Sequence, residues 1–295
     1  MKILITGGAG FIGSAIVEAI HKDHEVIVLD NLTTGSLENL NSLEVDFREG
    51  HTRKIGELVP EKVDLILHLG MASTTALYLK DRNLVATEIE GSIAVFEKAV
   101  KDNAKVVIAS SSSIYSGGQL PSKESQEVYV NDFYTECRLC IERLSKLYHD
   151  LYGMEVVNLR MFAVYGGARE KAKEKYANMV TKFIWRIKQG LSPVSYGDGT
   201  QTRDFTYIDD VVKAWLLASE YKGFGIFNVG TGKNYNFNEV VEMINKIMET
   251  NLPMTYEPNP FKNFVFHCHA DTTKAEQELG FKAEIILEQG IKKLI

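Results

Sequence analysis

The segment KILITGGAGFIG (2–13) does more than any other to decide the fold. Its first residues are apolar and β-branched, which predicts a strand, and GSAIVEAIHKD (13–23) then has helical spacing. Gly7, Gly10 and Gly13 lie between the two. Glycines let the backbone approach a pyrophosphate closely, and a helix N-terminus adds N–H groups and a positive dipole. A structural turn can also be glycine-rich, but this placement favours a dinucleotide-binding loop.

Segments of the same apolar, β-branched kind recur through the first half of the chain. They are EVIVLD (25–30), LEVDF (43–47), DLILHLG (64–70), KVVIASS (105–111) and EVVNLRMF (155–162). Near-continuous apolar strands are typical of parallel sheets covered on both faces. Helical patterns at 91–102 and 135–153 alternate with these segments. The alternation predicts an α/β fold with a doubly wound parallel, Rossmann-type sheet.

After Tyr165 the alternation weakens and charged residues become frequent. We predict a dinucleotide-binding domain formed by residues 1–165 plus 203–232. Residues 166–202 plus 233–295 are expected to form a smaller α/β substrate-binding lobe. This lobe would pack over the carboxyl edge of the sheet, where open α/β sheets bind their ligands.

The composition narrows the classes of function. The chain has 295 residues with a net charge of -6, so it has no electrostatic basis for binding nucleic acid. No run approaches the ~18 apolar residues of a membrane span, and no signal-peptide pattern precedes the first strand. Three cysteines do not make a disulfide framework. We therefore expect a cytoplasmic protein without nucleic-acid or membrane partners.

The second predicted strand ends at Asp30, where a carboxylate can bond both hydroxyls of an adenosine ribose. This residue favours NAD over NADP, because a carboxylate repels the 2′-phosphate of NADP. Asp46, near the end of the third predicted strand, is either a contact for the adenine edge or an ordinary loop carboxylate. The remaining residues predicted to bind the cofactor are Phe11, Ile12, Asn31, Phe47 and Gly70.

Tyr134 and Arg138 are four residues apart in a segment with helical spacing. Residues i and i+4 share one face of a helix, so the phenol and the guanidinium can point into one site. A tyrosine with the ordinary pKa of about 10 is a poor base at neutral pH, and a nearby positive charge favours its deprotonated form. The pair is a candidate base with its activating cation, or an ordinary helix surface.

Further motifs occur in an order that identifies a family. They are VLDNL, HLGMAS, ASSSSIY, LRMFAVYG, GDGTQTRDFTYIDDVV and FNVGTG. With the glycine loop and Tyr134 they span most of the chain, and the sequence resembles the extended short-chain dehydrogenases/reductases of the nucleotide-sugar epimerase and dehydratase group. DNLTTG (30–35) and GDGTQTRDF (197–205) are similar to UDP-glucose 4-epimerases. HLGMASTTALY (68–78) and YGGAREKAKEK (165–175) are similar to ADP-heptose 6-epimerases.

The resemblance implies an epimerase with bound NAD. In such enzymes a tyrosinate takes the proton of a sugar hydroxyl while hydride passes to the nicotinamide, and the keto-sugar then accepts hydride on its other face. Tyr134 matches this base, and Ser111 matches the hydroxyl that bonds the same sugar oxygen. Ser112 is expected to contact the substrate. Arg138 is expected to assist Tyr134 and to contact the cofactor.

Three residues depart from the family pattern. Arg138 stands where the family has lysine, and Glu88 stands where it usually has asparagine. Ala163 replaces a second asparagine, which commonly contacts the substrate phosphate. Arginine keeps the positive charge, but its planar guanidinium has another shape and does not readily release a proton. These changes concern the activity rather than the fold.

Lys173 in the predicted lobe and Arg203 at its border are candidates for substrate contacts. Lys173 aligns with a second catalytic lysine of the heptose-epimerase branch, although residues 171–175 form a charge run typical of a solvated face. Arg203 matches the family arginine that clamps the substrate diphosphate, a role suited to a fork of donors. A surface arginine beside Asp204 is the alternative. Tyr207 is expected in the same wall as Arg203.

The sequence therefore predicts an NAD-dependent epimerase of a nucleotide-diphosphate sugar, acting at C4 of a UDP-hexose. An ADP-heptose-type 6-epimerase and a nucleotide-sugar reductase are alternatives. A 4,6-dehydratase is disfavoured, because Ser112 and Ser113 stand where dehydratases carry Asp-Glu. The alternative from another class is an NAD-binding regulatory or scaffold protein that has lost catalysis, as the three departures would allow.

No metal site is predicted. Cys137 and Cys140 lie on the predicted tyrosine helix, without the loop geometry of zinc sites, and are interpreted as buried and unreactive. FVFHCHA (264–270) alternates like a strand, which would place His267 and His269 on one face. His68 ends a buried strand and is expected to be a hydrogen-bonded core residue.

A homodimer is expected from the resemblance. Family members commonly pair through the tyrosine helix and the helix that here spans about 88–101. That helix has an apolar stripe which could serve either the core or a dimer: Ile89, Ile93, Phe96 and Val100.

Overall fold

The structure is a computed structural model that describes residues 1–259 and 265–295 and, within 171–175, the side chain of Lys173 alone. Among these residues, seven parallel strands form a central sheet in the order β3-β2-β1-β4-β5-β6-β9. The strands are β1 (Lys2–Thr6), β2 (Glu25–Asp30), β3 (Asp46–Glu49), β4 (Leu65–His68), β5 (Lys105–Ser111), β6 (Val156–Met161) and β9 (Phe224–Val229). The predicted doubly wound, Rossmann-type sheet is confirmed.

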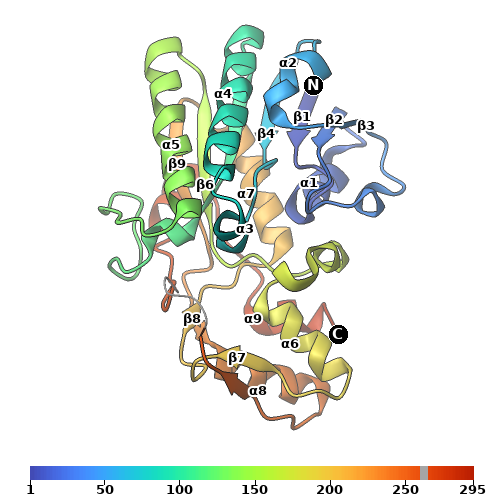
Figure 1. Cartoon of the computed structure of the whole chain (residues 1–295), viewed down its shortest axis with the longest axis vertical. Helices are drawn as coiled ribbons and strands as arrows, with labels where there is room; N and C mark the ends of the chain where they lie inside the picture. The colour runs from blue at the N-terminus through green and yellow to red at the C-terminus, as the bar shows by residue number, and fades with distance from the viewer. Residues whose placement is uncertain (260–264) are drawn as a thin grey trace.

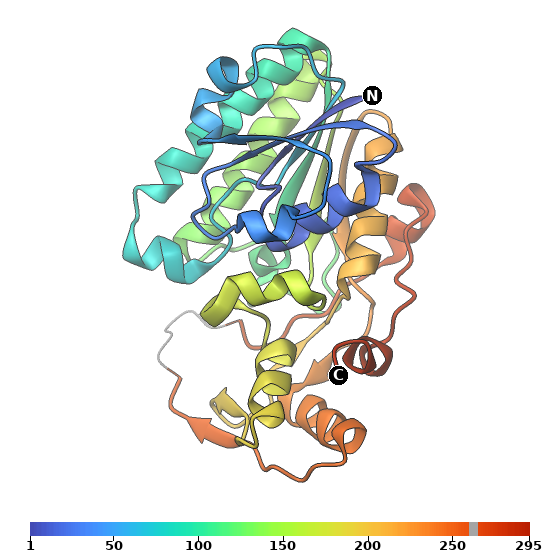
Figure 2. The same cartoon turned by 90° about the vertical axis from the view of Figure 1, so that its right-hand side faces the viewer.

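Helices cover both faces of this sheet (Figure 1, Figure 2). On one face lie α1 (Phe11–Ile20) and α7 (Ile208–Glu220), and on the other lie α4 (Leu84–Asp102) and α5 (Phe133–Tyr152). The double cover explains the continuous apolar strands, since β2 is buried from its second residue to its last. The described helices include none that is long and apolar enough to cross a membrane.

Shorter helical segments connect these elements. They are α2 (Ile55–Leu58), α3 (Thr75–Lys80), the 3₁₀ turns η1 (Leu37–Leu40), η2 (Thr52–Lys54), η3 (Ser112–Tyr115) and η4 (Ala168–Tyr176), and the π-helical turn η5 (Ala275–Leu279). Several of them follow the carboxyl ends of strands, so they help to shape that edge of the sheet.

The strand order creates a switch point between β1 and β4. From β1 the chain continues outward to β2 and β3, and then crosses to β4, β5, β6 and β9 on the other side. At such a point the connections diverge and leave a crevice at the carboxyl edge, where open α/β sheets bind ligands. Gly7 after β1 and Gly70 after β4 flank this crevice.

A smaller lobe lies at the carboxyl edge of the sheet (Figure 1). Its helices are α6 (Met179–Lys188), α8 (Phe237–Met248) and α9 (Leu287–Lys292). Its strands form two short pairs: antiparallel β8 (Thr202–Arg203) with β10 (Tyr235–Asn236), and parallel β7 (Val194–Tyr196) with β11 (Thr255–Glu257). The lobe thus places residues from the second half of the chain opposite the crevice.

The predicted boundaries, 1–165 plus 203–232 against 166–202 plus 233–295, stay a prediction. The C-terminal part of the chain returns to the larger unit, because Lys274 Nζ donates a hydrogen bond to a β9 carbonyl at 3.1 Å. A boundary drawn by sequence alone therefore assigns this returning segment to the lobe, although it also contacts the sheet.

Two predicted strands differ from the structure. The third strand was expected at 43–47 but is Asp46–Glu49, because β3 is an edge strand that pairs only with β2 among the described strands and needs no apolar run. In FVFHCHA, residue 264 lies outside the described residues, 265–269 contain no strand, and Ala270 forms a single bridge with Ser122. The alternating apolar and polar residues of this segment therefore do not mark a strand. His267 makes a side-chain contact instead, since one of its ring nitrogens lies 3.1 Å from Thr202 Oγ1.

Helix α5, which carries Tyr134, has well-defined ends. Asp132 caps its start, because its Oδ1 accepts a hydrogen bond from the Thr135 N–H at 3.0 Å. Gly153 follows its last residue with φ +70°, as predicted for a glycine that ends a helix in the left-handed conformation. Tyr134 consequently lies in a fixed first turn, at the carboxyl edge of the sheet.

Candidate active site

A cleft of about 540 Å³ opens along the carboxyl ends of β1, β2, β4 and β5. Most residues predicted for the site line it: Gly7, Gly10, Phe11, Ile12, Gly13, Asp30, Asn31, Gly70, Ser111, Ser112, Tyr134, Arg138, Lys173 and Arg203. Three predicted residues, Asp46, Phe47 and Tyr207, are not among its lining residues. The volume falls in the range of about 300–1,000 Å³ that is usual for small-molecule sites.

The glycine loop packs too closely for side chains. A Cβ on Gly7, whose φ is +72°, would lie 2.7 Å from the Gly70 backbone nitrogen, and one on Gly13 would lie 2.2 Å from the Gly7 carbonyl oxygen. The loop leads into α1, whose first N–H groups have no partner within the helix. Such a cradle accepts a pyrophosphate, so the loop fits a dinucleotide.

Asp30 occupies the place expected for the acid of a dinucleotide site. Its Oδ2 accepts a hydrogen bond from the Ala9 N–H at 3.0 Å and its Oδ1 accepts one from the Leu32 N–H at 2.8 Å. Burial raises the pKa of this carboxyl, while the backbone N–H groups act in the opposite direction. The two bonds fix the carboxylate at the end of β2, on the border of the cleft.

Asp46 and Phe47 lie elsewhere, because the third strand begins later than predicted. Asp46 starts β3 and forms an ion pair with Arg48 at 2.5 Å. His51 and Thr52, which follow the true carboxyl end of β3, line the cleft in their place. A correct strand end would have indicated these two residues, since the residues that follow parallel strands form the binding edge.

Tyr134 and Arg138 form the far end of the cleft. The Arg138 Cζ lies 5.2 Å from the centroid of the Tyr134 ring, a cation–π distance. Ser111 ends β5, lines the same cleft, and accepts a hydrogen bond from the Ser113 N–H through its Oγ at 3.1 Å. The structure thus places the phenol, the hydroxyl and the cation in one cleft, and their chemical roles stay predictions.

The Arg138 guanidinium is held by the segment that follows β4. Its Nη2 donates to the Ala72 carbonyl oxygen at 2.7 Å, and its Nη1 lies 2.6 Å from Met71 Sδ. Glu88 holds the same segment, because its Oε1 accepts from the Ala72 N–H at 2.9 Å. Two of the three departures from the family pattern therefore contact the backbone of one residue, Ala72.

Ala163, the third departure, also lines the cleft, at φ +21°. Asn178 donates a hydrogen bond from its Nδ2 to the Ala163 carbonyl oxygen at 3.0 Å. An asparagine amide is therefore present in this part of the cleft, but it is bound to backbone. Asn178 is the N-cap residue of α6, so its sequence pattern is that of an ordinary helix start and does not indicate a site residue.

Lys173 and Arg203 reach the cleft from the other side. Lys173 Nζ lies 5.5 Å from the centroid of the Phe11 ring, at the start of α1. Burial lowers the pKa of the Lys173 ammonium group, and Glu170 opposes this shift. Lys173 is half-buried and lines the cleft, whereas a charge run alone is typical of a solvated face. Arg203 lines the cleft from strand β8.

Tyr207 was expected beside Arg203, but the structure places it outside the cleft. Its ring packs edge-on against Tyr165 at 5.4 Å, and Lys293 Nζ lies 5.0 Å from its centroid. Cys268, which was not predicted, lines the cleft instead, with its Sγ 3.5 Å from Ser112 Oγ. No local pattern could indicate Cys268, since it reaches the site from a distant part of the chain.

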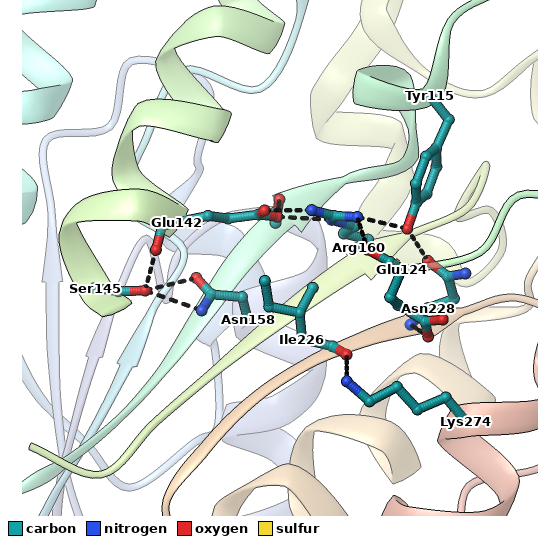
Figure 3. A network of polar contacts seen from close by, with 10 residues as sticks. Tyr115, Glu124, Glu142, Ser145, Asn158, Arg160, Ile226, Asn228 and Lys274 are labelled. Atoms are coloured by element: carbon teal, nitrogen blue, oxygen red, sulfur yellow. Dashed lines mark hydrogen bonds and ion pairs between the residues drawn. The ribbon is translucent and has the colours of Figure 1, made fainter. Parts of the chain in front are cut away.

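A buried polar network fixes α5 against the sheet (Figure 3). Arg160 on β6 donates from Nε and Nη2 to the two carboxylate oxygens of Glu142 on α5, at 3.0 and 2.6 Å. Its Nη1 donates to the Tyr115 hydroxyl at 2.7 Å, and that hydroxyl donates to Asn228 Oδ1 at 2.8 Å. The network joins the tyrosine helix to β6, β9 and the turn after Ser111.

The histidine and cysteines that were considered as possible metal ligands or proton carriers are packed in the fold. His68 is fully buried, with Nδ1 2.8 Å from Thr6 Oγ1 and Nε2 3.1 Å from Ser92 Oγ, which confirms a hydrogen-bonded core histidine. Cys137 is buried, whereas Cys140 is half-buried and so less enclosed than predicted. The described residues contain no group of three or more His, Cys, Asp or Glu side chains that could hold a metal ion.

A doubly wound sheet with a glycine cradle at its switch point, and a tyrosine with its cation in the same cleft, defines a short-chain dehydrogenase/reductase of the nucleotide-sugar type. Within that class, the chain belongs to the NAD dependent epimerase/dehydratase family, which matches residues 3–230. The predicted resemblance is confirmed. NAD is the cofactor of this family, and the cradle and Asp30 fit it.

Individual relatives are similar over nearly the whole chain. A putative UDP-glucose 4-epimerase of Methanocaldococcus jannaschii is 36% identical, over 99% of this chain and 97% of the relative. The UDP-N-acetylglucosamine 4-epimerase of Methanobrevibacter ruminantium, solved with UDP-N-acetylmuramic acid, is 30% identical with a TM-score of 0.92, over 99% of this chain and 96% of that one. The UDP-glucose 4-epimerase of Thermotoga maritima, solved with UDP-glucose, is 31% identical with a TM-score of 0.91, over 100% and 97%.

Proposed function

We propose that this protein is an NAD-dependent epimerase of a nucleotide-diphosphate sugar, acting at C4 of a UDP-hexose. The observation that carries the proposal is the joint position of Ser111, Tyr134 and Arg138 in the cleft that also contains the glycine cradle. The similarity to UDP-glucose and UDP-N-acetylglucosamine 4-epimerases supports this choice of substrate class.

NAD, when bound, would accept hydride from the sugar carbon and return it, so that no net oxidant is consumed. Ser111 Oγ and the Tyr134 hydroxyl would hold the reacting sugar hydroxyl, and Tyr134 would take its proton as the carbon–hydrogen bond breaks. The buried Arg138 guanidinium lies over the Tyr134 ring, where its positive charge would face the group that takes the proton. Tyr134 would return the proton once the keto-sugar has presented its other face.

Cations of the opposite wall are suited to the anionic part of the substrate. We assign Arg203 to the diphosphate, because a guanidinium can donate two parallel hydrogen bonds to phosphate oxygens. Lys173 lies near the start of α1 and is the candidate for a second proton donor. Its position in the cleft favours an ADP-heptose-type 6-epimerase as the second candidate function.

Turnover followed by proton NMR tests these assignments. UDP-glucose, UDP-N-acetylglucosamine, GDP-mannose and an ADP-heptose would each be incubated with the protein and NAD, and separately with NADP. A new anomeric signal that approaches a fixed ratio, without accumulation of reduced cofactor, is expected for UDP-glucose. A signal with the ADP-heptose alone would select the second candidate. NAD binding without turnover of any sugar in the panel would favour the catalytically inactive regulatory or scaffold protein.

A homodimer remains part of the proposal, as does a cytoplasmic location. The apolar stripe predicted on α4 lies partly in the core and partly at the surface, because Phe96 is fully buried whereas Ile93 is 37% exposed. On α5, Leu147 and Leu151 are exposed at 51% and 70%. Exposed apolar residues on these two neighbouring helices support a pairing surface, and sedimentation velocity would test it.

A further inference from the structure

Glu88 and Arg138 clamp the first residues after β4. Glu88, on α4, accepts a hydrogen bond from the Ala72 N–H at 2.9 Å, and Arg138, on α5, donates to the Ala72 carbonyl oxygen at 2.7 Å. Both side chains line the cleft, and they are exposed by only 5% and 4%. A buried carboxylate and a buried guanidinium thus hold the backbone N–H and the carbonyl of one residue, Ala72, beside the cleft.

One oxygen of this carboxylate has no protein partner. Glu88 Oε1 accepts the hydrogen bond from the Ala72 N–H, but Oε2 is buried and accepts no hydrogen bond from any described residue. Leaving such an oxygen unsatisfied costs more than most protein hydrogen bonds contribute. Burial raises the pKa of the Glu88 carboxyl, while the Ala72 N–H and the charge of Arg138 act in the opposite direction. A hydroxyl group of a ligand would satisfy this oxygen.

The position of Glu88 along the cleft identifies the ligand group. Asp30 stands at the end of β2, the glycine cradle follows β1, and Glu88 contacts the segment after β4. A dinucleotide that crosses the switch point has its adenosine ribose near β2 and its pyrophosphate at the cradle. Its second ribose would then be directed toward β4 and β5, on the side of the cleft that Glu88 and Tyr134 line.

We propose that Glu88 Oε2 accepts a hydrogen bond from a hydroxyl of the ribose in the nicotinamide half of NAD. Asp30 and Glu88 would then be a matched pair of carboxylates, one for each ribose of the dinucleotide. The two Nη atoms of Arg138 contact Met71 and Ala72, whereas its Nε has no hydrogen-bond partner among the described residues, so its predicted contact with the cofactor stays a prediction. The inference rests on the NAD part of the proposed function and deepens it.

Binding measurements with fragments of the cofactor test this inference without turnover. ADP contains the adenosine ribose alone, whereas ADP-ribose also contains the second ribose but no nicotinamide. Isothermal titration calorimetry would compare ADP, ADP-ribose and NAD on the wild-type protein and on Glu88→Gln. The glutamine amide keeps the shape and an acceptor for Ala72, but it places a donor where Oε2 was.

We expect Glu88→Gln to bind ADP as the wild type does and to bind ADP-ribose and NAD about tenfold more weakly, the usual loss for one hydrogen bond to a charged group. Glu90→Gln is the matched control, because Glu90 is an exposed residue of the same helix that pairs with Arg53. It should change none of the three affinities. Asp30→Asn should weaken all three.

A second measurement keeps the inference testable if Glu88→Gln does not fold. The wild-type protein should bind ADP-ribose more weakly when either the 2′- or the 3′-hydroxyl of its second ribose is replaced by hydrogen. Equal affinities for ADP-ribose and both deoxy analogues would overturn the inference, as would an unchanged affinity of Glu88→Gln for ADP-ribose. Failure of ADP and NAD to bind the wild type at all would instead contradict the proposed function as well.

Discussion

Tyr134 is the residue on which the proposed chemistry depends, and its place in the first turn of α5 is set by the Asp132 cap. Replacing it with phenylalanine removes the proton acceptor but keeps the ring that packs against Tyr78 at 5.6 Å. We expect Tyr134→Phe to lose at least about 100-fold in kcat while its affinity for NAD is preserved, as is usual when a positioned base is removed. Undiminished turnover would remove Tyr134 as the base.

Arg138 is the second residue of this pair, and its charge rather than its shape is expected to matter. Arg138→Lys keeps the positive charge near Tyr134, so activity should stay within about tenfold of the wild type or rise. Arg138→Met has a similar length without charge and should lose about 100-fold. The comparison of both variants in one assay is decisive. Joint loss of NAD binding and turnover in the lysine variant would show that the pocket requires the guanidinium bonds to Met71 and Ala72.

His68 makes the stability depend on pH. Burial lowers its pKa to about 3, and the charges of Arg138 and His51 add to the shift. An unfolded histidine has a pKa near 6.5, so between pH 6.5 and about 3 the unfolded chain binds one proton more than the folded chain. The contribution of His68 to stability is complete above pH 6.5 and is lost toward pH 3.

We therefore expect His68 to lower the free energy of unfolding by about 1.4 kcal/mol for each unit by which the pH decreases between 6.5 and about 3. Urea unfolding at several pH values would compare the wild type with His68→Gln, which should have the shallower dependence. Parallel curves for the two proteins would show that His68 is not the group responsible.

At the scale of elements, the tyrosine helix is fixed by the ion pair between Glu142 and Arg160. Both side chains are buried, at 2% and 5% exposure. Removal of one partner leaves an uncompensated buried charge, so Arg160→Met should destabilise the fold by about 3–5 kcal/mol in urea unfolding. The double variant Glu142→Gln with Arg160→Met should recover part of that loss. A double variant less stable than the single one would mean that the two residues do not act as a pair.

The elements show why sequence reasoning succeeded in some places and failed in others. β1, β2 and β5 were predictable because strands buried on both faces must be apolar throughout. β3 is an edge strand with a polar sequence, so its position could not be read from hydrophobicity, and Asp46 was misplaced with it. Tyr134 and Arg138 were predictable because their spacing is local to one helix.

At the scale of the whole molecule, the site is completed by residues that come from outside the sheet; family motifs indicate Arg203 and Lys173, but no local pattern indicates Cys268. Cys268 and Arg203 reach the cleft from the lobe, and Lys173 reaches it from the connection before α6. Tyr207 has the same sequence neighbourhood as Arg203 but faces the core beside Tyr165. Which of these side chains point into the cleft depends on how the lobe folds back over the sheet, and a single sequence does not contain that geometry in local form.

The central claim is that this cleft oxidises and re-reduces one carbon of a nucleotide sugar. Its most direct test is to start two samples, one with UDP-glucose and one with UDP-galactose, and to follow the anomeric protons by NMR. Both samples are predicted to converge on one fixed ratio without a build-up of reduced NAD. Formation of a different product, or reduced NAD in proportion to the sugar consumed, would contradict the account.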